Sequence, residues 1–260
     1  MKLYVFKINS ILKSIFLIIA IIVLVVVFFY SRQEVLTVFQ TKRDLPIYSV
    51  DCPDKKIAIT FDCAWGSDDI PDILKILESH DVRATFFIVG TWAEKFPEAV
   101  RMIFEAGHDV ANHSYSHIKM GNIDKSRVKD EILKCDTVLE KITGKEVNLF
   151  RAPYGEYNNN VVRAARELNY YTIQWDVDSL DWKPGITPEK IHERINNNIK
   201  NGSILLFHND TAHTVATISD IIVNLKNNGY IFVPVSELII KDSYYIDNTG
   251  KQRKNKSDNL

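Results

Sequence analysis

The chain alternates short apolar runs with segments of helical periodicity, and this alternation restricts its fold more than any other feature of the sequence. Seven apolar runs predict strands, and a helical pattern follows each of them. Strands and helices that alternate in this way predict an α/β fold built on a parallel sheet. The expected strands cover residues 57–61, 84–89, 108–112, 148–150, 171–176, 203–207 and 230–233, and the expected helices cover residues 69–79, 97–106, 124–142, 159–168, 188–199, 214–227 and 234–240.

Polar side chains follow most of the apolar runs at the point where each expected strand ends. An open doubly wound sheet and a closed barrel are both compatible with the alternation. No glycine-rich phosphate loop follows the first run, which weakens the nucleotide-binding form of the open sheet. Only a barrel brings the ends of nearly all strands to one mouth, so a barrel is favoured. The polar residues in question are Asp62, His113, His117, Arg151, Asp178, Asp181 and His208.

The N-terminal region carries an apolar segment that is long enough to cross a bilayer. Residues 11–30 amount to about 30 Å of helix, and residues 15–30 are apolar on every face. A cleaved signal peptide is the nearer alternative, but no small-residue cleavage site follows the segment. We therefore expect an uncleaved single-pass anchor. More basic residues precede it than follow it, which places the N-terminus in the cytoplasm and the bulk of the chain outside.

The remaining composition sets the domain limits and excludes some partners. We expect a cytoplasmic N-terminus over residues 1–10, a stalk over residues 31–54, one domain over residues 55–240 and a disordered tail over residues 241–260. The net charge of −1 gives no overall field that would favour nucleic acid. The three cysteines form no zinc-knuckle spacing and predict no disulfide framework.

The polar residues at the strand ends supply the groups that metal-assisted hydrolysis requires. His113 and His117 are four residues apart, so both imidazoles can reach one metal ion. Asp62 could accept a proton from a water molecule, and Arg151 could pair with Asp62 and keep it ionised. One of the two carboxylates in the segment 178–181 could contact His208 and raise its pKa. Each residue alone also has an ordinary structural explanation, such as a capping aspartate or a buried structural histidine.

Five segments, in their order along the chain, resemble the motifs of the polysaccharide deacetylase family, also called carbohydrate esterase family 4 or the NodB-homology domain. The resemblance covers about residues 55–238 and looks most like the sporulation-associated PdaB-type branch. It implies a distorted (β/α) barrel of about seven parallel strands that removes acetyl groups from N-acetylated sugars. The segments are Thr60-Phe61-Asp62, His113-Ser114-Tyr115-Ser116-His117, Arg151-Ala152-Pro153-Tyr154, Asp178-Ser179-Leu180-Asp181-Trp182 and Leu206-Phe207-His208.

The resemblance also implies a role for each matching residue. Asp62 would be the catalytic base, His208 the catalytic acid, and Asp178 the carboxylate that tunes His208. Arg151 would steady Asp62, and the metal ligands would be His113 and His117. The backbone amide of Tyr154 would help to hold the oxyanion, while Trp182 and Leu206 would line the pocket for the acetyl methyl group.

One position departs from the family pattern. The family usually has a second aspartate after the first, as a metal ligand, and this chain has Cys63 there. A thiolate can bind zinc, which would favour Zn²⁺ over harder ions, with Co²⁺ as the second candidate. The alternative is that Cys63 is a small buried residue, which would leave the metal with two histidines. The PdaB-type branch resembles this chain in lacking the second aspartate.

Together these observations predict a membrane-bound, metal-dependent hydrolase that acts on carbon–nitrogen bonds other than peptide bonds. The expected substrate is the N-acetyl group of amino sugars in peptidoglycan or a chitin-like glycan. The alternatives are a weak or inactive glycan-binding protein on the same fold and a glycosidase that uses Asp62 and Asp178 as its carboxylate pair. The expected partners are the glycan and the lipid bilayer, with no nucleic acid.

Overall fold

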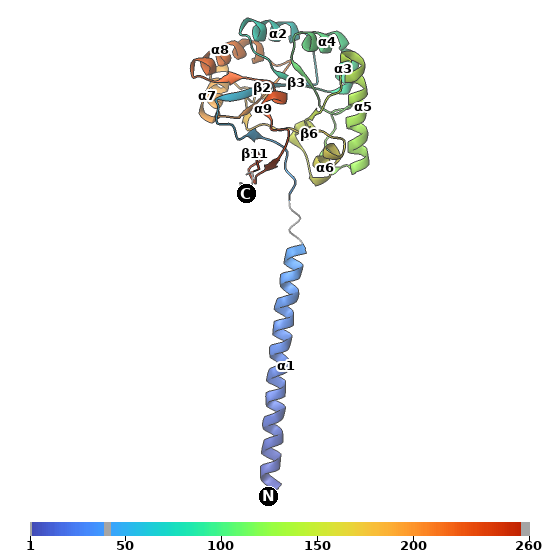
Figure 1. The fold of residues 1–260 in the computed structure, drawn as a ribbon, viewed down its shortest axis with the longest axis vertical. Coiled ribbons are helices and arrows are strands. Elements are labelled where there is room, and N and C mark those ends of the chain that lie inside the picture. The colour runs from blue at the N-terminus through green and yellow to red at the C-terminus, as the bar shows by residue number, and fades with distance from the viewer. Residues whose placement is uncertain (1, 39–42, 256–260) are drawn as a thin grey trace. The chain divides into compact units, whose positions relative to one another are not determined.

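The computed structural model describes residues 2–38 and 43–255, and the chain divides into two units, residues 1–43 and 44–260. The first unit contains one long helix, α1 (Lys2–Val38) (Figure 1). Its segment Ile11–Tyr30 has a mean hydropathy of 3.2, and none of it is buried within the structure. This helix is therefore long and apolar enough to cross a membrane or to serve as a signal sequence.

The second unit is an α/β domain built on one sheet of parallel strands, as the alternation predicts. The strand order is β6-β5-β4-β3-β2-β8-β7, and β9 pairs with β2 beside this path. All of these pairs are parallel. The strands are β2 (Lys56–Cys63), β3 (Thr85–Ile88), β4 (Asp109–Asn112), β5 (Leu149–Phe150), β6 (Tyr171–Thr172), β7 (Val177–Asp178), β8 (Ile204–His208) and β9 (Ile231–Phe232).

Helices connect these strands and cover the outside of the sheet (Figure 1). Apolar residues recur along their inner faces, and these residues are buried. The short helix α3, which begins at Gly90, is an element that the sequence patterns did not predict. The helices are α2 (Ile70–Ser79), α3 (Gly90–Lys95), α4 (Pro97–Glu105), α5 (Lys125–Thr143), α6 (Asn159–Glu167), α7 (Pro188–Asn198), α8 (Thr214–Asn227) and α9 (Val235–Leu238).

The barrel is distorted because its two end strands do not pair with each other. The expected strand 171–176 is shortened to β6, and the separate strand β7 follows it; the two lie at opposite ends of the strand order. A segment from before the first barrel strand crosses this opening. Ile47 forms a parallel bridge with Ile173 beside β6, and Ser49 forms an antiparallel bridge with Ser203 beside β8. The resulting architecture agrees with the predicted distorted barrel.

The alternation of side chains along β2 places the catalytic candidates. Ile57, Ile59 and Phe61 pack outward with apolar residues of the surrounding helices. Residues at even positions face the interior of the barrel, where Ala58 packs with apolar residues from β3, β4, β5 and β8. Asp62 continues this inward series at the carboxyl end of the strand. The barrel therefore presents Asp62 at its mouth.

The structure differs from the expected stalk and disordered tail. Residues 31–38 belong to α1, and residues from Asp44 onward belong to the folded unit, where Ile47 and Val50 are buried. A second sheet has the order β1-β11-β10 and joins β1 (Ser49–Val50), β11 (Lys251–Lys254) and β10 (Tyr244–Ile246). Strands of two to four residues give little periodic signal in the sequence. The pairing of β11 with β1 and β10 orders residues that were expected to be disordered. Residues 256–260 lie outside the described part of the chain.

Candidate active site

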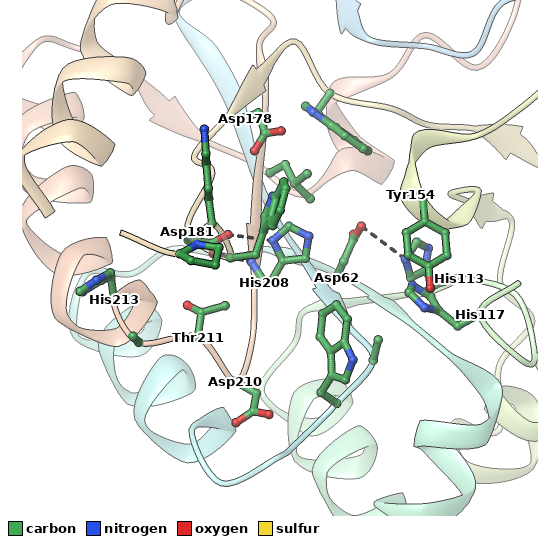
Figure 2. A pocket seen from close by; sticks show the side chains of 18 of the residues that line it. Asp62, His113, His117, Tyr154, Asp178, Asp181, His208, Asp210, Thr211 and His213 are labelled. Atoms are coloured by element: carbon green, nitrogen blue, oxygen red, sulfur yellow. Dashed lines mark hydrogen bonds and ion pairs between the residues drawn. The ribbon is translucent and has the colours of Figure 1, made fainter. Parts of the chain in front are cut away.

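A cavity of about 760 Å³ opens at the carboxyl ends of the barrel strands. Figure 2 shows Asp62 between His208 on one side and His113 with His117 on the other. The cavity gathers most of the residues that the sequence singled out, with Arg151 buried behind Asp62 and Cys63 directed elsewhere. The predicted residues that line it are Asp62, His113, His117, Tyr154, Asp178, Trp182, Leu206 and His208.

Arg151 makes the predicted contact with Asp62 inside the barrel. The guanidinium is fully buried, and its Nη1 donates to Asp62 Oδ1 at 2.6 Å. The same Nη1 donates to Thr60 Oγ1, and the guanidinium lies 3.9 Å from the centre of the Phe87 ring. Burial alone would raise the pKa of Asp62, but Arg151, His113 and His208 outweigh it and lower that pKa. Asp62 is therefore a carboxylate at neutral pH.

His113 turns an unprotonated nitrogen toward that carboxylate. Its Nδ1 lies 2.8 Å from the backbone oxygen of Arg151, to which it can only donate. This contact leaves Nε2 as the acceptor nitrogen, 3.4 Å from Asp62 Oδ2. Burial lowers the pKa of His113 despite the opposing effect of Asp62, so the ring is neutral. The lone pairs of His113 Nε2 and of the Asp62 carboxylate thus face each other, and a cation between them would stabilise this arrangement.

His117 completes the pair from a tight loop after β4. It adopts a left-handed backbone conformation with φ of 55°, and its ring centre lies 5.1 Å from that of His113. The ring also packs against Tyr154 at 4.6 Å and against Trp65 at 5.8 Å. Burial and then the neighbouring His113 lower the pKa of His117 to about 4. His117 is therefore a second neutral imidazole at neutral pH.

These donors fit a divalent metal ion held by few protein ligands. Neutral imidazoles and a carboxylate are the ligands that zinc prefers, and catalytic zinc sites keep positions open for water or substrate. His113 and His117 would hold the ion, with Asp62 beside it. Within residues 2–38 and 43–255, no group of three or more His, Cys, Asp or Glu side chains is arranged to hold a metal. The site therefore fits two histidine ligands rather than a larger cage.

Cys63 is not placed with these donors, which corrects its expected role as a metal ligand. Because successive side chains of a strand face opposite sides, the inward direction of Asp62 sends Cys63 outward. The thiol is fully buried among apolar residues that include Phe61 and Trp92. Burial, followed by the charges of Asp62 and Asp69, raises the pKa of Cys63 well above its usual range. Cys63 is a protonated residue of the apolar layer.

His208 contacts a different carboxylate from the one that the family resemblance implied. Its Nδ1 lies 2.8 Å from Asp181 Oδ1, and its backbone amide donates to Asp181 Oδ2 at 2.7 Å. Asp178 instead accepts from the backbone amide of Leu180, which turns the chain with φ of 58°. Burial would lower the pKa of His208, but Asp181, together with the charges of Asp62 and Asp178, outweighs it and raises that pKa. Asp181 therefore takes the tuning contact predicted for Asp178, which still lines the cavity.

Aromatic side chains surround the mouth of the cavity. Tyr154 and Trp182 are 57% and 53% exposed, which leaves their rings free to meet a ligand. Tyr154 has φ of 60°, so a tight turn after Pro153 directs this segment toward the cavity. Leu206 is buried on β8 and supplies an apolar wall. Trp65 also lines the cavity and was missed, although its position three residues after Asp62 was a usable signal.

Comparison with known proteins identifies the family. Residues 49–173 match the sequence model of the polysaccharide deacetylases. A peptidoglycan-N-acetylglucosamine deacetylase of Bacillus cereus is 36% identical over 192 residues, which cover 72% of this chain and 89% of that protein. The peptidoglycan-N-acetylmuramic acid deacetylase PdaA of Bacillus subtilis is 28% identical over 197 residues, 75% of each chain.

Among solved structures, BA3943 of Bacillus anthracis, a pseudoenzyme of carbohydrate esterase family 4, matches with a TM-score of 0.72. The two chains are 34% identical, and the match covers 75% of this chain and 69% of BA3943. The chain belongs to the polysaccharide deacetylase family, whose enzymes are hydrolases that act on carbon–nitrogen bonds. Deacetylases of this family are generally metal-dependent.

Proposed function

We propose that this protein is a membrane-anchored, metal-dependent deacetylase of N-acetylated amino sugars in the cell wall. The observation that carries this proposal is the pairing of two opposed groups across one cavity. Arg151 holds Asp62 as an anion, and Asp181 stabilises the protonated form of His208. A base and an acid on opposite sides of one acetamido group are what hydrolysis of an amide requires.

The residues divide the proton transfers between them. Asp62 accepts a proton from the attacking water, and Arg151 keeps the carboxylate in place during this step. His208 donates a proton to the departing amine, which is a poor leaving group until it is protonated. His113 and His117 would hold a divalent ion, which when bound supplies Lewis acidity toward the acetamide oxygen and the water. Zn²⁺ suits the imidazole ligands, and Co²⁺ is the second candidate.

Three further residues would position the substrate. The backbone amide of Tyr154 would donate to the developing oxyanion. Trp182 and Leu206 would enclose the acetyl methyl group between an exposed aromatic ring and a buried aliphatic wall. These contacts would favour a small acetyl group over bulkier acyl groups.

The relatives and α1 support a proposal for the substrate and the location. The matched Bacillus proteins are named for deacetylation of N-acetylglucosamine or N-acetylmuramic acid in peptidoglycan, and either sugar or a chitin-like glycan is a candidate here. We propose that α1 is an uncleaved anchor with a cytoplasmic N-terminus, which brings the domain to the wall side of the membrane. A role in sporulation belongs to the same proposal.

Acetate release tests the mechanism. The full-length protein in detergent is incubated with peptidoglycan or chitooligosaccharide, with and without added Zn²⁺ or Co²⁺. Asp62→Asn and His208→Ala are expected to lose the activity, because each removes one proton-transfer group. Asp220→Asn on α8 and His192→Ala on α7 are matched controls away from the cavity. Unchanged acetate release in the first two variants contradicts the mechanism, and cleaved glycan chains would indicate a glycosidase.

In the part of the chain that the structure describes, no third ligating side chain joins the two histidines, and this favours a second candidate function. Cys63 stands in the position of the usual metal-binding aspartate and is directed into the apolar layer. The Bacillus anthracis relative is described as a pseudoenzyme. A weakly active or inactive glycan-binding protein is the corresponding alternative. This alternative is favoured if the protein binds glycan but retains no detectable metal when one equivalent of metal is supplied. Metal binding with turnover would exclude it.

A further inference from the structure

Glu131 is a buried carboxylate that contacts the loop carrying His117. It lies on α5, and its side chain is fully buried. Glu131 Oε2 accepts from the backbone amide of Ser116 at 2.8 Å, and the Ser116 hydroxyl donates to the carboxylate at 2.8 Å. Arg127, one helical turn earlier, donates to Glu131 Oε1 at 2.8 Å. A charge is costly to bury unless it is paired, and these donors pair it.

The loop that Glu131 contacts is held in an unfavourable backbone conformation. Ser114 and His117 have φ values of 64° and 55°, in the left-handed region that residues with a side chain rarely occupy. Such conformations persist only where surrounding contacts impose them. Helix α3 fixes the start of the loop, because the backbone amides of Gly90 and Thr91 donate to the carbonyls of Ser114 and Tyr115.

The far end of the loop depends on Ser116, which immediately precedes His117. The His117 amide donates to Ser114 Oγ at 3.0 Å, so this contact is local to the loop. Glu131 supplies the contact at Ser116 that reaches outside the loop, to the long helix α5. The backbone at His117 is thereby tied to a rigid helix as well as to its own turn.

We propose that Glu131 is a positioning residue that holds His117 where it can share a metal ion with His113. This inference rests on the proposed function, because it concerns the same metal site. Because the proposed site has two imidazole ligands, displacement of either ring removes one of the two protein ligands of the ion. Glu131 contacts neither the substrate nor the ion, and it acts through Ser116. Residues that orient metal ligands typically change metal affinity 10- to 100-fold when altered.

The test measures metal affinity directly, apart from catalysis. Zn²⁺ and Co²⁺ binding by the full-length protein is measured by equilibrium dialysis for wild type, Glu131→Gln and Ser116→Ala. Glu131→Gln keeps the shape but replaces one accepting oxygen by a donor, and affinity is expected to fall about tenfold. Ser116→Ala removes the hydroxyl and keeps the amide, so a smaller loss is expected. Glu140→Gln, at an exposed position on the same helix, is the matched control and is expected to bind as wild type does.

Amide hydrogen exchange provides the second readout, without any metal. The amides of Ser116 and His117 are expected to exchange faster in Glu131→Gln, while core strand β2 keeps its protection. Unchanged metal affinity in a folded Glu131→Gln protein overturns the inference. If Glu131→Gln fails to fold, unchanged affinity in Ser116→Ala overturns it. A wild type that binds metal but releases no acetate overturns the proposed function and leaves the positioning role standing.

Discussion

The two sides of the cavity use the same residue type in opposite electrostatic settings. The Nδ1–H group of His208 donates a hydrogen bond to the Asp181 carboxylate, and that contact raises the pKa of His208. The Nδ1–H group of His113 donates instead to the uncharged Arg151 carbonyl, and burial lowers the pKa of His113. One side therefore keeps a proton that it can donate, and the other keeps lone pairs that can bind a metal. The hydrogen-bond partner of Nδ1 therefore decides whether the imidazole acts as a proton donor or as a metal ligand.

The largest effects are expected when one histidine is substituted on each side of the cavity. His208→Asn places an amide where Nδ1 was and removes the proton donor, so deacetylation should fall about 10²- to 10⁴-fold with metal affinity unchanged. His117→Gln should instead weaken metal binding. Turnover and equilibrium dialysis on both variants check this pair. Equal losses of metal affinity in both variants would show that the two sides are not distinct.

The next largest effect concerns Asp62, the charged residue between the two sides, and its contribution to the stability of the protein. Arg151→Met should leave Asp62 buried without its main partner, and the free energy of unfolding should fall by about 3–5 kcal/mol. Urea denaturation followed by circular dichroism measures this loss. The double variant Arg151→Met with Asp62→Asn should recover part of the stability, because no unpaired charge remains. A single variant as stable as wild type would mean that Asp62 is not ionised in the fold.

A change in pH dependence should follow from the loss of the Asp181 charge. A raised pKa keeps His208 protonated, and therefore active as an acid, to higher pH than an ordinary histidine. Asp181→Asn removes the main cause, so the alkaline limb of the kcat profile should move to lower pH. Activity on that limb should fall about tenfold for each unit of pKa lost. Asp178→Asn is the comparison variant, and a larger shift there would restore the role first predicted for Asp178.

The same raised pKa makes a small contribution to folding. A group whose pKa is higher in the folded state stabilises the fold below its unfolded pKa, about 6.5 for histidine, and this stability is lost as pH rises through the folded pKa. Asp181→Asn should therefore reduce the difference in unfolding free energy between pH 6 and pH 9. Thermal denaturation at the two pH values measures it. An unchanged difference would contradict the assignment of the raised pKa to Asp181.

The smallest expected effect is that of Cys63→Ala. Because the thiol packs in the apolar layer, Zn²⁺ affinity should not change, and the free energy of unfolding should fall by about 1 kcal/mol. Equilibrium dialysis and urea denaturation provide the two values. A loss of zinc affinity of tenfold or more would return Cys63 to the metal site.

The sequence was sufficient for the barrel and for most residues at its mouth, because strand periodicity and residue chemistry are both local signals. The inward direction of Asp62 also implied the outward direction of Cys63, so this correction was available from strand geometry alone. The choice between Asp178 and Asp181 was not available, because it depends on the left-handed turn at Leu180. Glu131 was equally hidden, since it lies fifteen positions after Ser116, on the separate element α5.

The short sheet formed by β1 and β11 has a consequence for how the protein is made. Ser49 and Val50 align with Lys251 and Gln252, so the first strand of the domain pairs with a segment that follows all of the barrel strands in the sequence. A ribosome makes the barrel strands before it makes the segment that pairs with β1. The small sheet can therefore form only after the whole barrel has been synthesised.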